Sequence, residues 1–212
     1  MGCDSSKAAN QGQIIWILGY PSSGKTFMAD YLATLDWVNV DGDWISQETD
    51  PKVLAKFEGL EEAIGKDVNE QPMTAKEWKV TQLYLKGLVD KAKAEAKKGI
   101  NAAVSFVLYT KKSRDYIRSL VPTIQFVRID VELSKMMASN RVRQTKMCEG
   151  YGMTLAEMYD QHVTPEEKEK LGGEYTDERL DKYFQMKYYS GLKDFEESEK
   201  AYTHVIDNNS YG

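Results

Sequence analysis

The sequence IIWILGYPSSGKT, at residues 14–26, decides the fold of this chain. Residues 13–18 form a continuous apolar run, which is typical of a buried parallel strand, and a Gly-rich turn follows at once. Beyond the turn, apolar residues recur at helical spacing from Gly24 to Leu35. The stretch therefore predicts a strand, a Gly-rich loop and a helix in succession, which is the unit of a parallel α/β sheet.

The loop between this strand and this helix matches G-x-x-x-x-G-K-T. Glycines let several backbone N–H groups turn inward around phosphate oxygens, and the helix points its positive end at them. In such a loop Lys25 reaches the β and γ oxygens, and the Thr26 hydroxyl coordinates magnesium. We expect the loop to bind ATP with Mg²⁺ through Gly19, Ser22, Ser23, Gly24, Lys25 and Thr26.

Composition limits what else the chain can be. A net charge of −5 and a pI near 5.3 provide no basic field for a nucleic-acid partner. No apolar run approaches the ~20 residues that cross a bilayer. Cys3 and Cys148 are far apart and have no partners at metal-ligand spacing, which argues against disulfides and zinc and suits a reducing compartment. These features predict a single cytoplasmic domain at residues 13–212.

Residues 1–12 are small, polar and without periodicity, which predicts a disordered tail. The tail also fits the myristoylation pattern, with Gly2 exposed after methionine removal and Ser6 at the required position. Cys3 beside it suits palmitoylation, and two acyl chains would anchor the protein to a membrane. The alternative is a chance match of a short pattern.

Strand-like and helix-like segments alternate along the rest of the chain. The predicted strands are residues 13–18, 37–40, 102–108, 123–131 and 203–207. The predicted helices are residues 24–35, 51–64, 74–98, 112–120, 132–146 and 177–200. This alternation implies right-handed crossovers and a five-stranded parallel sheet with helices on both faces.

One polar, Gly-containing region interrupts the alternation, at about residues 141–175. It contains two capping boxes, Thr154 to Glu157 and Thr164 to Glu167, in which side chains satisfy the first backbone donors of a helix. The region is predicted to form short helices on a mobile lid insertion. A further capping box at Thr74 starts the longest predicted helix.

Asp41-Gly42-Asp43 follows the second predicted strand. Ligands of open parallel sheets sit outside the carboxyl ends of the strands, so these carboxylates should face the phosphate loop. One can hold magnesium, while the other accepts the proton of an attacking hydroxyl. The alternative reading is that Asp-Gly marks only a turn.

Basic residues form two groups, one after the third predicted strand and one before the insertion. Arg141 and Arg143 belong to the second group, and closing arginines can stabilise a transferring phosphoryl group. Because they are two residues apart, they do not share one face of a continuous helix. The alternative for all these residues is an exposed helix charge.

The assembled pattern resembles the P-loop small-molecule kinases, the group of gluconate, shikimate and adenylate kinases, and is most similar to gluconokinase-like proteins. The similarity covers Gly19–Thr26, Val40–Ile45, Val104–Arg118, Arg141 with Arg143, and Val205–Asn208. It implies the three-layer P-loop NTPase sandwich with a lid. It also implies that Asp43 contacts substrate and metal, Arg114 and Arg118 bind a sugar acid, Arg141 and Arg143 belong to the lid, and Asn208 lies near the adenine.

The chain also departs from the gluconokinase pattern. Ser46 stands where a His is usual, Ser22 or Ser23 replaces a Gly of the loop, and Arg143-Gln144-Thr145-Lys146 replaces a Lys-Gly-His lid motif. These departures leave the acceptor open.

Three functions follow. The first is an ATP- and Mg²⁺-dependent kinase of a small hydroxylated, sugar acid-like metabolite, with Lys25, Asp41, Asp43, Arg141 and Arg143 as catalytic residues. The second is a nucleoside or nucleotide kinase that grips a base through residues 43–78. The third is a non-catalytic ATP-binding protein held at a membrane or assembly by its acylated tail.

Overall fold

The structure, a computed structural model, describes residues 11–68, 71–189 and 197–208. The acylation predicted at Gly2 and Cys3 lies outside these residues. Five parallel strands form one sheet in the order β2-β3-β1-β4-β5. They are β1 (Ile14–Leu18), β2 (Val38–Asp41), β3 (Ala102–Ser105), β4 (Gln125–Asp130) and β5 (Thr203–Asp207). The predicted α/β class and all five predicted strands are confirmed.

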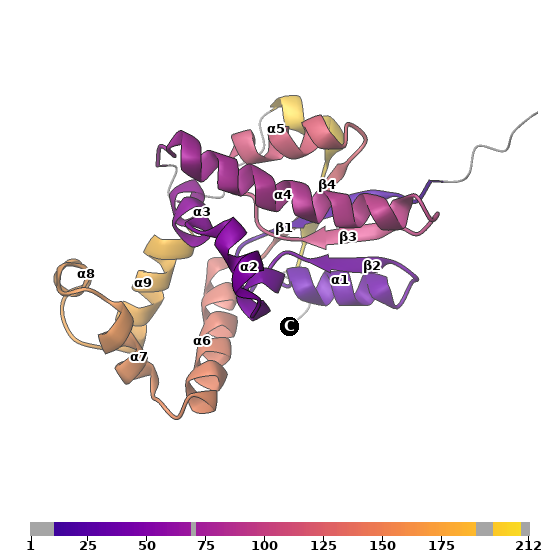
Figure 1. Cartoon of the computed structure of the whole chain (residues 1–212). Coiled ribbons are helices and arrows are strands. Elements are labelled where there is room, and N and C mark those ends of the chain that lie inside the picture. Colours follow the sequence, from indigo (N-terminus) through magenta and orange to yellow (C-terminus); the bar gives the residue numbers. More distant parts are fainter. Residues whose placement is uncertain (1–10, 69–70, 190–196, 209–212) are drawn as a thin grey trace, which may run out of the picture.

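The central strand β1 is apolar throughout because helices cover both of its faces (Figure 1). Trp16 and Leu18 point into one core, beneath α4 (Ala75–Ala96) and α5 (Lys111–Leu120). Ile17 points the opposite way and packs with Ala29 of α1 (Lys25–Ala33). The period-two alternation of strand side chains thus builds the three-layer sandwich that was predicted.

Helix α4 begins where its capping box predicts. The Thr74 side chain accepts from the Glu77 backbone N–H, and the Glu77 carboxylate accepts from the Thr74 backbone N–H at 2.7 Å. The helix runs for 22 residues and buries one stripe, which includes Tyr84 and Leu88, against the sheet.

The segment predicted as one helix over residues 51–64 is broken. It consists of α2 (Pro51–Leu54), the 3-10 turn η2 (Ala55–Phe57) and α3 (Leu60–Val68). The break is at Gly59, whose φ of 79° lies in the left-handed region. Gly65, which follows the predicted end of this helix, lies inside α3, so the predicted boundary at residue 64 was wrong. A glycine favours a helix boundary where the backbone turns left-handed, as at Gly59. The sequence alone does not show which of the two glycines adopts that conformation.

The last predicted helix is also shorter than expected. Helix α9 (Asp177–Tyr188) ends well before Lys200, and the 3-10 segment η3 (Glu197–Tyr202) precedes β5. A further 3-10 turn, η1 (Trp44–Gln47), follows β2.

Helices α6 (Leu133–Gly150), α7 (Leu155–His162), α8 (Pro165–Leu171) and α9 form a lobe beside the sheet (Figure 1). Both predicted capping boxes of this region are present. The lobe has its own apolar core, built around Cys148, Met158, Tyr159 and Leu180. Within the described residues, none of the helices combines the length and apolar character that a membrane-spanning segment needs.

Candidate active site

The phosphate loop, Gly19–Thr26, connects β1 directly to α1 at the carboxyl edge of the sheet. Gly24 caps α1 with a φ of 98°, a conformation that a side chain would strain. Ser22 also lies in the left-handed region, with a φ of 63°, so the loop carries one strained non-glycine residue. The Ser23 side chain is buried, and its hydroxyl has no hydrogen-bond partner within the described part of the chain. The loop is curved and rich in donors, as anion binding requires.

Lys25 folds back over this loop. Its Nζ atom donates to the main-chain oxygens of Gly19 at 2.9 Å and Tyr20 at 2.8 Å. Burial lowers the pKa of Lys25 to about 8, although Asp43 opposes this shift, and Arg143 adds to it. The ammonium group is therefore incompletely compensated by the protein and is suited to an incoming anion.

The acidic turn, Asp41-Gly42-Asp43, follows β2 on the same edge of the sheet. The backbone N–H of Asp43 donates to Asp41 Oδ1 at 2.9 Å. The backbone N–H of Gly42 donates to the main-chain oxygen of Ser105 at 3.0 Å. The Tyr84 hydroxyl donates to the Gly42 oxygen. The first bond stabilises the turn internally, and the other two fix it to β3 and α4.

The Asp43 carboxylate interacts electrostatically with Lys25 of the phosphate loop. Burial raises its pKa most, and the negative charge of Asp41 raises it further, while Lys25 and Arg143 lower it. A carboxylate whose pKa is raised is a stronger proton acceptor in its ionised form than an ordinary one.

A first cavity of about 540 Å³ opens beside the phosphate loop. Seven of the residues that the sequence indicated line it, namely Ser22, Gly24, Lys25, Thr26, Asp41, Asp43 and Arg143. Asn208 lies at its border, where its Nδ2 atom donates to the Ser23 oxygen at 3.3 Å. The structure therefore brings together residues from the ends of three strands and from α6.

A second cavity of about 570 Å³ adjoins the first. Asp43, Phe106 and Arg143 line both cavities, and Tyr84, Phe57 and residues of α3 complete the second. Ligand sites typically have volumes of ~300–1,000 Å³, so each cavity can hold a small molecule.

Arg141 and Arg143 have different surroundings. Arg141 donates to Asp177 Oδ2 at 3.1 Å and to Asp181 Oδ2 at 2.9 Å, which ties α6 to α9. Arg143 is exposed and lines both cavities; within the described residues it forms no ion pair. Of the two arginines predicted to close over the phosphates, the structure brings only Arg143 to the phosphate loop, because residues two apart face different sides of α6.

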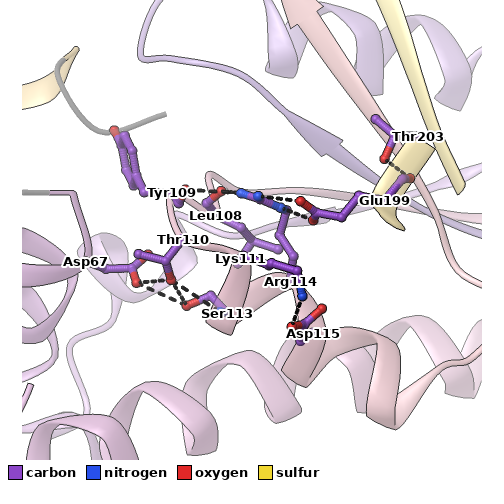
Figure 2. Close-up of polar contacts among 10 residues, drawn as sticks. All are labelled: Asp67, Leu108, Tyr109, Thr110, Lys111, Ser113, Arg114, Asp115, Glu199 and Thr203. Atoms are coloured by element: carbon purple, nitrogen blue, oxygen red, sulfur yellow. Dashed lines mark hydrogen bonds and ion pairs between the residues drawn. The ribbon is translucent and has the colours of Figure 1, made fainter. Parts of the chain in front are cut away.

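Arg114 and Arg118 lie away from both cavities, contrary to the expectation. Arg114 is buried and donates to Glu199 Oε1 at 2.6 Å and Oε2 at 3.0 Å (Figure 2). Its Nη1 atom also donates to the Tyr109 oxygen at 3.1 Å. The Arg118 guanidinium stacks 3.3 Å from the centroid of the Tyr202 ring. Segment η3 supplies the partners of both side chains, Glu199 and Tyr202. Arg114 thereby supports the loop after β3, and Arg118 joins α5 to η3.

Several residues of the site had no signal in the sequence. Tyr189, just after α9, donates its hydroxyl to the Pro21 oxygen at 2.8 Å, and its ring packs against Tyr20. Asn140 is buried on α6 and lines the first cavity. These contacts join segments remote in sequence, and only the packing of the lobe reveals them.

The sequence predicts a magnesium site at Thr26 and Asp43. In the described residues, no cluster of three or more His, Cys, Asp and Glu side chains could hold an ion alone. Mg²⁺ usually keeps water, takes one or two carboxylates and shares the phosphates of its substrate, so such a cluster is not required for it. Thr26 and Asp43 line one cavity and would supply the protein ligands.

No protein-family model matches the sequence, and no curated protein does. Among solved structures, it is similar to a sugar kinase from Janibacter sp. HTCC2649, with 16% identity over 92% of this chain and 85% of that chain and a TM-score of 0.51. A gluconokinase from Sinorhizobium meliloti 1021 matches at 15% identity over 93% of this chain and 83% of that chain, with a TM-score of 0.46.

The likeness to the sugar kinase concerns the fold and extends over nearly the whole chain. Together with the sheet order and the phosphate loop, it identifies the architecture: this chain has the α/β fold of the P-loop small-molecule kinases.

Proposed function

We propose that this protein is an ATP- and Mg²⁺-dependent kinase that transfers the γ-phosphoryl group to a hydroxyl of a small molecule. The observation that carries the proposal is the position of Asp43 and Arg143, which line the cavity of the phosphate loop and also the neighbouring cavity. A group transferred between molecules in the two cavities has to pass between a carboxylate and a guanidinium. A nucleotide-binding protein without catalysis has no need of this arrangement.

The phosphate loop holds the donor in this proposal. Backbone N–H groups from Gly19 to Thr26 and the amino end of α1 surround the phosphates, and Lys25 neutralises the β and γ oxygens. Asn208, next to the Ser23 oxygen, borders the nucleoside side of the site. Bound magnesium, held by Thr26 and Asp43, would draw charge from the phosphates.

The acceptor lies in the second cavity with its hydroxyl beside the acidic turn. Its oxygen forms a bond to the γ-phosphorus, and the bond from that phosphorus to the bridging oxygen of ADP breaks. ADP leaves with the electron pair, and the hydroxyl proton passes to Asp43. Asp41 orients the turn through its bond to the Asp43 backbone, and Arg143 stabilises the charge on the transferring group.

Replacement of Lys25 by Met tests the donor site. We expect K25M to lose ATP turnover while its unfolding transition remains cooperative, because Met keeps the length of the side chain and removes the charge. Lys86→Met is the matched control, since Lys86 is exposed on α4 and pairs only with Asp90 among the described residues. Equal ADP release by K25M and the parent, with any acceptor, would refute the kinase proposal.

Asp43→Asn separates catalysis from nucleotide binding. We expect this variant to bind ATP in calorimetry with an affinity within about tenfold of the parent, since the change removes one charge near the metal. Its turnover should fall by about 10²- to 10⁴-fold, the usual loss when a general base is removed. A parent protein that binds ATP and phosphorylates no acceptor would instead support the non-catalytic function.

The tail and the cellular location complete the proposal. A cytoplasmic protein acylated at Gly2 and Cys3 would carry the kinase domain to a membrane surface. Intact mass measurement of the protein purified from its native cell tests this, and an unmodified amino terminus would rule it out.

A further inference from the structure

The wall of the second cavity is mainly apolar and aromatic. It is formed by Ile45 after the acidic turn, Phe57 of η2, Leu60 and Ile64 of α3, Tyr84 of α4 and Phe106 after β3. These side chains come from five segments, and they surround a single space of about 570 Å³. A cavity so lined binds the apolar surface of a ligand and leaves few polar groups to orient it.

The rings of Phe57 and Phe106 both contact the Tyr84 ring edge to face, and the three rings together are called the aromatic layer here. The Tyr84 ring lies 5.4 Å from that of Phe57 and 5.6 Å from that of Phe106, both edge to face. Trp44 stacks on Tyr84 with ring centroids 5.9 Å apart and supports the layer. Because the Tyr84 hydroxyl donates to the Gly42 oxygen, the layer is joined to the acidic turn. The position of these rings relative to Asp43 is therefore fixed.

The charges on the wall disfavour an anionic acceptor. Two carboxylates, of Asp43 and Glu61, line the second cavity, and Arg143 is its only cation within the described residues. Arg143 also lines the first cavity, where the phosphate groups of the donor would attract it. A carboxylate on the acceptor would thus meet Glu61 with no cation of its own.

The cations expected to recognise a sugar acid are engaged elsewhere. Arg114 forms a buried pair with Glu199, and Arg118 stacks on Tyr202 (Figure 2 shows the Arg114 pair). A buried guanidinium leaves its carboxylate only at a cost of several kcal/mol.

We propose that the acceptor is an uncharged molecule with a flat ring and a hydroxyl group, as in a nucleoside or an aryl alcohol, and that it is not a sugar acid. The ring packs on the layer of Phe57, Tyr84 and Phe106, and the hydroxyl reaches Asp43 at the junction of the two cavities. The inference rests on the proposed kinase function and specifies the substrate class of that site.

Binding measured without turnover tests the inference independently of catalysis. The full chain is saturated with Mg²⁺ and a non-hydrolysable ATP analogue, which fills the first cavity. Uridine, benzyl alcohol, gluconate and glucose are then titrated one at a time by calorimetry. We expect uridine or benzyl alcohol to bind at least about tenfold more tightly than gluconate and glucose, a difference of about 1.4 kcal/mol. The two ring compounds distinguish a nucleoside from an aryl alcohol.

Charge reversal at the cavity mouth provides the specific readout. Glu61 is exposed on α3, so Glu61→Lys leaves the core intact. It should tighten gluconate binding about three- to tenfold, because one exposed repulsion becomes an attraction, and leave uridine and benzyl alcohol nearly unchanged. Glu58→Lys is the control, since it makes the same charge change at an exposed residue that does not line the second cavity.

Three results would overturn the inference. They are tighter binding of gluconate than of both ring compounds, no measurable binding of either ring compound, or equal effects of E61K and E58K on gluconate. The kinase proposal fails differently, by ADP release that Lys25→Met does not change. Gluconate phosphorylation lost in K25M would therefore keep the kinase and discard this acceptor class.

Discussion

Gly42 lies at a close approach of the acidic turn to β3, and its replacement by Ala tests the geometry of the site. A Cβ atom at this position would lie 2.3 Å from Phe106 Cβ and 2.4 Å from Phe106 Cδ2. Ordinary van der Waals contact starts at 3.4 Å, so the two segments would have to separate by about 1 Å. Phe106 Cβ is attached directly to the backbone, and a rotamer change cannot relieve the overlap.

The expected cost follows from overpacking. Inserting a methyl group into a filled site destabilises a protein by ~1–3 kcal/mol, and a value of ~2 kcal/mol would lower the urea midpoint by about 1 M. Displacement of the turn also moves Asp43 by up to about 1 Å, and such a misplacement costs up to ~10²-fold in turnover. We expect G42A to show both losses.

Gly87→Ala is the matched control. Gly87 lies inside α4, and a Cβ atom added there would meet nothing within 4 Å. The change should stabilise the protein by ~0.5–1 kcal/mol, because Ala loses less backbone entropy than Gly in a helix.

Urea unfolding followed by circular dichroism measures both variants, and coupled ADP release measures turnover in the absence of urea. Opposite shifts of the two midpoints are expected. A G42A midpoint within experimental error of the parent, or a loss of stability in G87A equal to that in G42A, would refute the reasoning.

Three further predictions concern the charged residues. Arg114→Met should lower the free energy of unfolding in urea by ~3–5 kcal/mol, because it leaves the Glu199 carboxylate buried and unpaired. The double variant with Glu199→Leu should lose less stability than R114M alone. A double variant whose loss equals the sum of the two single losses would contradict the pairing of these buried groups. ATP affinity, measured by calorimetry, should be constant below pH 7 and fall above pH 8. The pKa of Lys25 is lowered to about 8 in the free protein, so above that pH the side chain must take up a proton to pair with phosphate. The limiting slope is about tenfold in affinity per pH unit, and an affinity that rises with pH would exclude this linkage. Arg143→Ala should lower kcat by ~10²-fold or more, as loss of a charge-stabilising arginine does. Arg141→Ala should mainly lower the free energy of unfolding, by ~1 kcal/mol, because it removes the exposed ion pairs with α9. Equal losses of kcat in steady-state assays of the two variants would show that Arg141 also acts at the site.

The sequence predicted the phosphate loop and the acidic turn correctly in position because both depend on local rules. Glycines and a following helix define the loop, and the carboxyl ends of parallel strands meet at one edge of the sheet. The strands were similarly predictable, since each is short and bounded by turns, and the central strand β1 is apolar throughout.

Other features of the site could not be predicted, because they depend on contacts between residues that are far apart in the sequence. The environment of Arg114 is set by Glu199, which is 85 residues away in the chain. The aromatic layer of the second cavity combines Phe57, Tyr84 and Phe106 from three separate segments. Gly59 and Gly65 look alike in sequence, and only the backbone conformation shows that Gly59 separates η2 from α3 while Gly65 lies inside α3.

The pair of Arg114 and Glu199 has a consequence for synthesis on the ribosome. Helix α5 is complete long before residue 199 emerges, so during that interval the Arg114 guanidinium has no access to its carboxylate. Burial of an uncompensated charge costs several kcal/mol, a large share of the stability of an ordinary domain. A released chain that ends before η3 should therefore stay protease-sensitive around α5, and a chain that includes η3 should be protected in pulse proteolysis. Segment η3 would thus act as a checkpoint, because the region around α5 reaches its full stability only after this segment has been released.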